Sequence, residues 1–269
     1  MVADASGIGG TGFDSLSADL AAVSVRGLDD VRAAAEALCD IARRVANLRV
    51  AVCDNIASKQ TMVDAEGNVL AADVFGWTEE GERWWADTRL ALSSPIPRAC
   101  RYESEPFWVN ASGFRTRQNN VYLDQISLDH FEKRALTRGA IVIPIHLPFG
   151  QIGAVTYNCW TKTRDDLSAE YEAHADMLGL LSHRFVAGYV KAHRSRHWLP
   201  GDCQLTKREV ECLRWASIGK TDKEISLILS RSHATVRFHI QNAGEKLDAV
   251  NRSQTIFKAA QLGFLAAAA

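Results

Sequence analysis

Apolar positions along the chain change their period several times, and each period predicts a different kind of element. From Leu28 to Leu48 they recur every three or four residues, for example at Val31, Ala35 and Leu38, the spacing of one helix face. The same period predicts three further helices, at Thr78–Leu92, Ile126–Arg138 and Leu167–Ala192. Apolar runs of strand character predict three strands, at Arg49–Ile56, Ala140–Ile145 and Gln151–Trp160.

The order of these elements predicts the fold class. The turn at Pro148–Gly150 makes an antiparallel hairpin of the two strands that flank it. Helices alternating with such strands indicate an α+β protein whose N-terminal part is an α/β/α sandwich with an antiparallel sheet. We predict a disordered leader over 1–24, a domain for small-molecule binding and dimerisation over 25–192, a linker over 193–203, and an all-helical domain over 204–269.

Four short helices are predicted after the linker, and each has its own start signal. In a capping box, a threonine hydroxyl caps the first turn while a glutamate three residues later reaches back to it. A serine or asparagine caps a helix in the same way with its side-chain oxygen. The signals are the pairs Thr206 with Glu209 and Thr221 with Glu224, then Ser232 and Asn251.

The third of these helices has one apolar face and one face of unusual composition. Its apolar residues face inward, and the opposite face carries Ala234, Arg237, Phe238, Gln241 and Glu245. A guanidinium pairs with guanine, an amide with adenine, and an aromatic ring contacts a thymine methyl group. We therefore predict a helix-turn-helix that reads double-stranded DNA, with base contacts from Arg237, Phe238 and Gln241.

Residues around this helix are expected to reach phosphates, which fix position without reading sequence. These residues are Thr221, Lys223, Thr235, His239 and Lys246. The competing interpretation is an ordinary helical bundle with a solvated, charged face. It explains the caps and the apolar face but gives no role to an exposed Phe238.

Charge and composition narrow the function further. The net charge is −1, divided into +3 from Gly201 onward and −4 before it, so the positive charge lies with the helix-turn-helix. Six cysteines lack metal-ligand spacing, and we expect reduced thiols, a cytoplasmic protein, no metal, and no cofactor besides a signal molecule. No membrane span and no catalytic motif is found, so we expect no enzyme. A redox sensor using Cys53, Cys100 or Cys159 is the alternative.

The C-terminal segment resembles the DNA-binding domain of LuxR-type regulators. The matching residues are LT-x-RE at Leu205–Glu209, K-E-I at Lys223–Ile225, S-x-x-TV at Ser232–Val236, and Asn251-Arg252. The resemblance implies base contacts from Arg237, Phe238 and Gln241. It also implies a homodimer on a palindromic operator, supported by a fourth helix over Arg252–Leu265, with RNA polymerase as a further candidate partner.

The N-terminal part resembles the autoinducer-binding domain of quorum-sensing members of that family. Gly139, Pro144-Ile145, Gly150 and Thr156 match the family's hairpin, and Ser94-Pro95 stands where the family has Asp-Pro. The resemblance implies a ligand pocket formed by Gly81, Trp85, Ser94, Trp108 and Thr156, to which Tyr102 is added as a candidate without a motif. Thr156 is expected either to bond a ligand carbonyl or to face solvent.

Two departures from the family concern the signal. Ser94 replaces an aspartate that accepts a bond from the amide of the signal, and a hydroxyl lacks the charge that strengthens this bond. Gly81 replaces a tryptophan, and Trp85 replaces a tyrosine. We expect a regulator that senses a small, largely apolar signal, an acyl-homoserine lactone or a non-standard analogue. The alternative is a ligand-independent regulator whose N-terminal domain serves dimerisation or a protein partner.

Overall fold

The computed structural model describes residues 10–78, 92–160, 164–193 and 203–265. The chain forms two compact units. The N-terminal unit extends to Arg194 apart from the turn Pro148–Gly150, and the C-terminal unit begins at Ser195. Within the described residues no helix is both long and apolar enough to cross a membrane.

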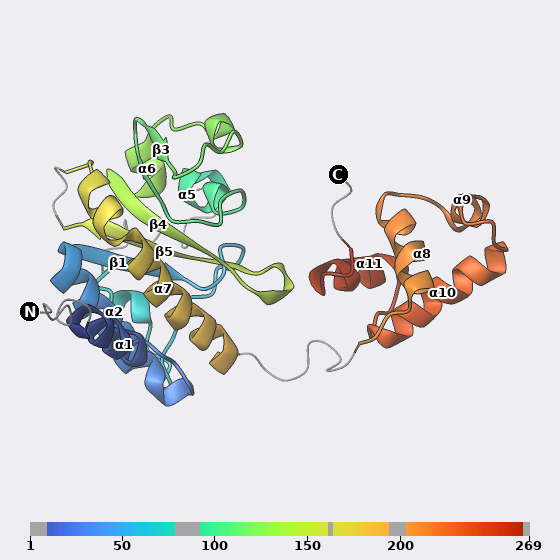
Figure 1. Cartoon of the computed structure of the whole chain (residues 1–269), viewed down its shortest axis with the longest axis horizontal. Coiled ribbons are helices and arrows are strands. Elements are labelled where there is room, and N and C mark those ends of the chain that lie inside the picture. Colours follow the sequence, from blue (N-terminus) through green and yellow to red (C-terminus); the bar gives the residue numbers. More distant parts are fainter. Residues whose placement is uncertain (1–9, 79–91, 161–163, 194–202, 266–269) are drawn as a thin grey trace, which may run out of the picture. The chain divides into compact units, whose positions relative to one another are not determined.

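A five-stranded antiparallel sheet forms the centre of the N-terminal unit (Figure 1). Its strands are β1 (Leu48–Cys53), β2 (Phe107–Asn110), β3 (Gly113–Arg115), β4 (Gly139–His146) and β5 (Ile152–Cys159), in the spatial order β1-β5-β4-β2-β3. All neighbouring strands are antiparallel, and β4 with β5 forms the predicted hairpin.

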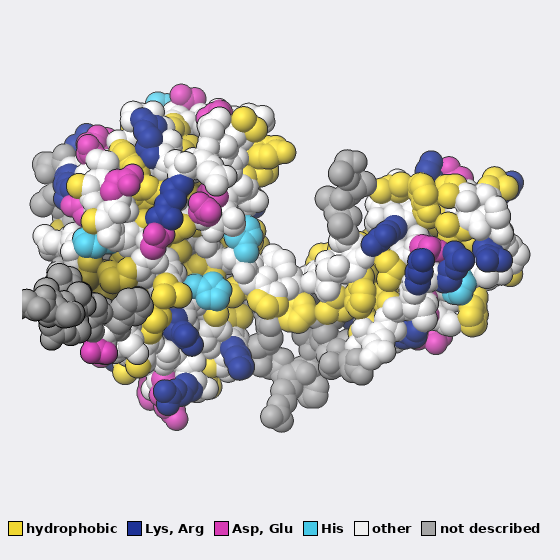
Figure 2. All heavy atoms as spheres, in the orientation of Figure 1, with side chains coloured by type: hydrophobic (Ala, Val, Ile, Leu, Met, Phe, Trp, Pro, Cys, Tyr) yellow, Lys and Arg dark blue, Asp and Glu magenta, His cyan; other side chains and the backbone are white. Residues whose placement is uncertain are grey.

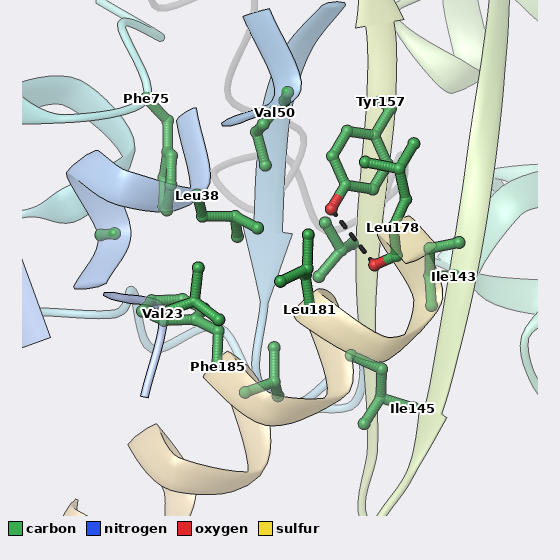
Figure 3. Close-up of a cluster of buried hydrophobic side chains, with 14 of the residues drawn as sticks. Val23, Leu38, Val50, Phe75, Ile143, Ile145, Tyr157, Leu178, Leu181 and Phe185 are labelled. Carbon is green, nitrogen blue, oxygen red and sulfur yellow. Dashed lines mark hydrogen bonds between the residues drawn. The ribbon is translucent and has the colours of Figure 1, made fainter. Parts of the chain in front are cut away.

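Two helices cover one face of this sheet, α2 (Val31–Ala46) and α7 (Ser168–His193), and α1 (Gly10–Ala22) packs against both of them. The short helices η1 (Leu28–Asp30) and α3 (Leu70–Asp73) belong to the same layer. Figure 3 shows the main core, in which side chains of α2 and α7 meet the inner face of the strands. The Tyr157 hydroxyl lies 2.7 Å from the Ser182 hydroxyl, so the buried ring keeps a polar partner.

The other face of the sheet is covered by shorter elements. These are α5 (Pro95–Ala99), η3 (Leu123–Gln125) and α6 (Phe131–Ala135), which pack around a second core that includes Phe107 and Val142. Seven of the eight residues of β4 are buried, because both of its faces are covered. Helices on both faces of an antiparallel sheet confirm the α/β/α fold class.

Two expectations for the N-terminal unit are wrong. The leader predicted to be disordered contains helix α1, because Leu20 packs on the core and Asp19 pairs with Arg44 at 2.7 Å. The helix predicted over Ile126–Arg138 is reduced to α6. Arg134 there donates to the carbonyl oxygens of Ser93, Ser127 and Asp129, and these tertiary bonds favour a loop before the helix. The helix predicted over Thr78–Leu92 lies almost entirely outside the described residues, as does most of the predicted linker.

The C-terminal unit contains the four predicted helices, which confirms the all-helical part of the fold class. They are α8 (Lys207–Ser217), α9 (Asp222–Ile228), α10 (His233–Lys246) and α11 (Arg252–Gln261). Both predicted capping boxes are present, and Ser232 and Asn251 cap α10 and α11. Between α8 and α9, Gly219 has a φ of +91°, a conformation that favours glycine.

Two adjacent leucines on α7 test the importance of the main core. Leu181 is fully buried, whereas Leu180 is 46% exposed. Leu181→Ala should lower the free energy of unfolding of the N-terminal unit by about 2–5 kcal/mol, since it leaves a cavity in a packed core. Leu180→Ala should change it by less than about 0.5 kcal/mol. Urea unfolding followed by tryptophan fluorescence measures both, and equal effects would contradict this packing.

Candidate ligand cavity and nucleic-acid interface

A narrow cavity of about 70 Å³ lies on the face of the sheet that α5 and α6 cover. Three residues with small side chains make room for it: Ala51 and Cys53 on β1, and Ala154 on β5. Cys53 and Ala154 are directly paired across the two strands, as are Ala51 and Thr156. All lining residues within the described part of the chain are uncharged at neutral pH, and burial raises the pKa of the Cys53 thiol to about 12.

Ser94 brings a hydroxyl to this cavity. It is 4% exposed and precedes Pro95, the first residue of α5. The residue stands at the N-cap position of α5, but its side chain makes no capping bond. The described part of the chain offers its hydroxyl no other hydrogen-bond partner, so the group is available to a ligand.

Thr156 brings a second hydroxyl, held by a neighbour on the same strand. The Asn158 side-chain amide donates to Oγ1 of Thr156 at 3.0 Å and lies closer to it than to the Thr156 carbonyl oxygen. Because Oγ1 already accepts this bond, the Thr156 hydroxyl can donate its own proton to a ligand oxygen. Of the two roles expected for Thr156, a bond to a ligand or exposure to solvent, its position in the cavity lining favours the first.

The other predicted ligand residues do not join this pair. Trp108 lies on the opposite face of the sheet, against the α2–α7 core and 5.9 Å from the Arg115 guanidinium. The expectation was wrong by one position, since side chains alternate along a strand and Phe107 takes the cavity-side face. Tyr102 is 52% exposed and stacks on Tyr122. Gly81 and Trp85 lie outside the described residues.

Among the lining residues missed from the sequence are Trp77, Thr137 and Asn158. Asn158 had a usable signal, because residues two apart on a strand share a face and Thr156 was already a candidate. Trp77 and Thr137 lie in loops, and only the tertiary fold brings them to the cavity. The Trp77 indole N–H donates to the Val50 carbonyl at 2.7 Å, which fixes its ring.

In the C-terminal unit, α10 exposes the predicted DNA-reading face. Arg237 and Gln241 are exposed, and Phe238 is 57% exposed with its ring edge toward His239. The inward face carries Val236, Ile240 and other buried residues of the core. Figure 2 shows lysine and arginine side chains gathered on the face of this unit that is in view. An exposed aromatic ring beside cationic groups suits a DNA groove better than water.

The predicted phosphate contacts differ in how freely they can act. Lys223 is exposed and forms no ion pair within the described residues, whereas the hydroxyls of Thr221 and Thr235 serve the caps of α9 and α10. Lys246 Nζ bonds both carboxylate oxygens of Glu209, at 3.0 and 2.9 Å, so its charge is largely used inside the domain. Arg231, exposed in the turn before α10, was missed although its charge and position suit a phosphate.

Two internal contacts fix the position of α10. The Glu209 carboxylate also receives the Thr206 backbone N–H at 2.7 Å, and therefore joins the start of α8 to the last turn of α10. Beyond that turn, the Lys258 ammonium donates to the carbonyl oxygens of Leu247 and Asp248, at 3.0 and 2.6 Å. A cation at a helix C-terminus also opposes the helix dipole favourably.

Comparison with known proteins agrees with this geometry. Residues 203–259 match the pattern of "Bacterial regulatory proteins, luxR family". The transcriptional activator LuxR of Aliivibrio fischeri is 37% identical over 191 residues, 71% of this chain and 73% of that protein. This chain belongs to the LuxR family.

Two further proteins are similar to parts of this chain. The transcriptional activator VanR of Vibrio anguillarum is 37% identical over 127 residues, which are 46% of this chain and half of VanR. A crystal structure of Escherichia coli SdiA is 23% identical, with a TM-score of 0.39 over 67% of this chain and 71% of SdiA. As a LuxR-family protein, this chain is a transcription regulator that binds DNA through its helix-turn-helix, and it is not an enzyme.

The buried Glu209 gives a test of what holds the LuxR-type domain together. Burial raises the pKa of Glu209, but the bonds from Lys246 and Thr206 outweigh it and leave the pKa below its ordinary value. Because the folded pKa is depressed, the ionised carboxylate stabilises the domain fully above about pH 5, and this contribution declines progressively as pH falls from there through the depressed pKa. Glu209→Gln should therefore lower the free energy of unfolding by about 1–2 kcal/mol at pH 7. This figure already allows for the partial exposure of Lys246, which weakens the ion pair.

Urea unfolding of the C-terminal unit at pH 7 and pH 4 measures the difference in stability between the wild type and Glu209→Gln. This difference should be smaller at pH 4. Glu211→Gln is the matched control, since Glu211 forms a surface pair with Arg208 on the same helix. Its effect should stay below about 0.5 kcal/mol. A Glu209→Gln cost that is unchanged at pH 4 would argue against an ionic role.

Proposed function

We propose that the chain is a signal-responsive regulator whose N-terminal unit binds a small, largely apolar molecule and thereby controls operator binding by a dimer. It acts in the cytoplasm, where it meets its DNA. The observation that carries the proposal is the uncharged cavity with two available hydroxyls, from Ser94 and Thr156. Sites for small ligands combine an apolar lining with a few placed polar groups, and this cavity has that composition.

The two hydroxyls suit complementary positions on a ligand. Thr156 can donate its proton, because the Asn158 amide already occupies one lone pair of its oxygen, and a ligand carbonyl oxygen is the matching group. Ser94 can accept from a ligand N–H as well as donate. An amide-containing signal, such as an acyl-homoserine lactone or an analogue, has both groups. These bonds would fix the orientation of a ligand whose affinity comes mainly from its apolar part.

Operator recognition is assigned to the exposed face of α10. Arg237, Phe238 and Gln241 are proposed to contact bases, and Lys223 and Arg231 to contact phosphates. A helix-turn-helix dimer reads two half-sites about one helical turn apart, which matches a palindromic operator. A signal that binds only the folded unit stabilises it by mass action, and this links signal concentration to the amount of competent dimer.

The second candidate is a regulator that needs no signal. The observation in its favour is Ser94, which replaces the aspartate of the family and cannot supply an ionic bond to a signal amide. In that case the N-terminal unit serves dimerisation or a protein partner, and the cavity stays empty. The two candidates differ in their response to added ligand.

Ligand binding should raise the melting temperature of the purified protein. At a ligand concentration of about 100 times Kd, the stabilisation is about 2.7 kcal/mol, or several degrees. The panel contains acyl-lactones with short, long and aromatic acyl groups, together with non-lactone signals. Ser94→Ala and Thr156→Val should each reduce the shift for the active compound, whereas Thr116→Val, on an exposed loop, should leave it unchanged. No shift with any compound, in a folded and DNA-binding protein, would support the second candidate.

DNA reading by α10 is tested on operators selected by the wild-type protein from random DNA. Arg237→Ala should weaken specific binding by about 1–3 kcal/mol and relax discrimination at one base pair. Lys223→Ala should instead weaken binding to all sequences alike. It should also lower by about 1 the slope of the logarithm of the binding constant against the logarithm of the salt concentration. Electrophoretic mobility shifts at several salt concentrations measure both. Unchanged affinity and base preference in Arg237→Ala would show that this face of α10 does not enter the groove.

A further inference from the structure

A basic cleft adjoins the ligand cavity of the N-terminal unit. The cleft has a volume of about 500 Å³, much larger than the cavity itself. Both spaces are lined by Trp77, Leu136, Thr137 and Asn158. A ligand whose body fills the cavity can therefore extend into the cleft. Among the described residues, the charged side chains that line the cleft are Arg49, Arg138, Arg164 and Glu132, which together carry a formal charge of +2.

Arg49 is a fixed cation between the two spaces. Its guanidinium carbon lies 4.0 Å from the centre of the Trp77 ring and 5.3 Å from that of Trp160. One of its terminal nitrogens donates to the carbonyl oxygen of Gly76 at 2.8 Å. These contacts hold a permanent positive charge at the boundary of a space whose described lining is uncharged. Such a charge favours an anion there.

The other two arginines are paired with carboxylates, and Arg164 keeps donors that its partners do not use. Arg138 Nε contacts Glu132 at 2.9 Å, and Arg164 Nη2 contacts Glu170 at 2.6 Å. Arg164 Nε donates to the carbonyl oxygen of Asp166. A guanidinium has five N–H groups, and Nη1 of Arg164 makes no hydrogen bond within the described part of the chain. Arg164 can therefore receive a second anion without losing its first.

We propose that the signal carries a negatively charged end group, a carboxylate, on an aliphatic or aromatic body. This inference rests on the proposed ligand-sensing function and adds the chemical class of the ligand. The body occupies the uncharged cavity, where Ser94 and Thr156 meet its polar atoms. The carboxylate lies in the cleft, where guanidinium groups donate to it. Charge-assisted bonds of this kind are about twice as strong as neutral ones, so they discriminate a free acid from a neutral lactone or ester.

The experiment compares matched pairs of neutral and anionic probes on the full-length protein. The probes are alkanoic and arylalkanoic acids of increasing length, each with its methyl ester, together with neutral acyl-lactones. Calorimetric titration at neutral pH should show at least one acid that binds about tenfold or more tightly than its ester. Added salt should weaken the binding of the acid and leave the binding of the ester unchanged, since salt screens only the charged ligand.

Variants then locate the charge that is responsible. Arg164→Gln with Arg138→Gln should lower the affinity for the acid to that for the ester, and leave the affinity for the ester unchanged. Arg117→Gln is the matched control, because Arg117 forms a comparable exposed ion pair with Asp176 but does not line the cleft. Melting temperatures of the three proteins without ligand confirm that each is folded.

Two results would overturn the inference, and they differ in what they leave standing. If neutral lactones or esters bind as tightly as the acids, and the double variant binds them equally well, the signal is neutral and the sensing function remains. If neither acids nor neutral probes bind to the folded protein, ligand sensing itself is wrong, and the anionic end group fails with it.

Discussion

Both faces of the β4–β5 hairpin must be covered, and the architecture of the N-terminal unit follows from this requirement. Side chains alternate across a strand, so Val155 and Tyr157 meet the long helices while Ala154 and Thr156 face the short ones. The first face is filled by large side chains and holds the unit together. The second is only partly filled, because its residues near β1 are small. The cavity is thus a consequence of a difference in side-chain volume between two faces of one hairpin.

A comparable constraint acts in the C-terminal unit, where contacts from α8 and from α11 fix the position of α10. Glu209 at the start of α8 holds Lys246, and Lys258 on α11 holds the carbonyl oxygens that follow α10. Arg252 at the start of α11 bonds Asp222 at the start of α9 and the carbonyl oxygen of Lys220. Helix α10, the proposed reading helix, is therefore supported by polar contacts as well as by its apolar face. Precise placement matters because base contacts in a groove depend on the angle of the helix.

The parts of this structure that sequence could predict are those that depend on neighbouring residues. The caps of α8 to α11 are local, and all four were predicted. The shortening of α6 was not, because it depends on bonds from Arg134 to the distant Ser93 and to the loop before the helix. Trp108 was placed in the pocket through the family resemblance, which says nothing of which face of β2 its side chain takes, and Phe107 takes the cavity-side face instead. Gly139 matched a family motif, but only the fold shows why. A Cβ there would lie 2.5 Å from the Asp165 carbonyl oxygen.

The exposed face of α10 has a consequence for how this regulator can change over generations. Its central side chains, Arg237 and Gln241, form no ion pair or hydrogen bond within the part of the chain that the structure describes. Substitution there should therefore leave the folded domain nearly as stable as before, and under the proposed base contacts it alters which base pairs are preferred. Target sequence and domain stability are thus separable properties. Under the proposed base contacts, single replacements on this one helix face would give a lineage new target promoters without compensating changes in the core.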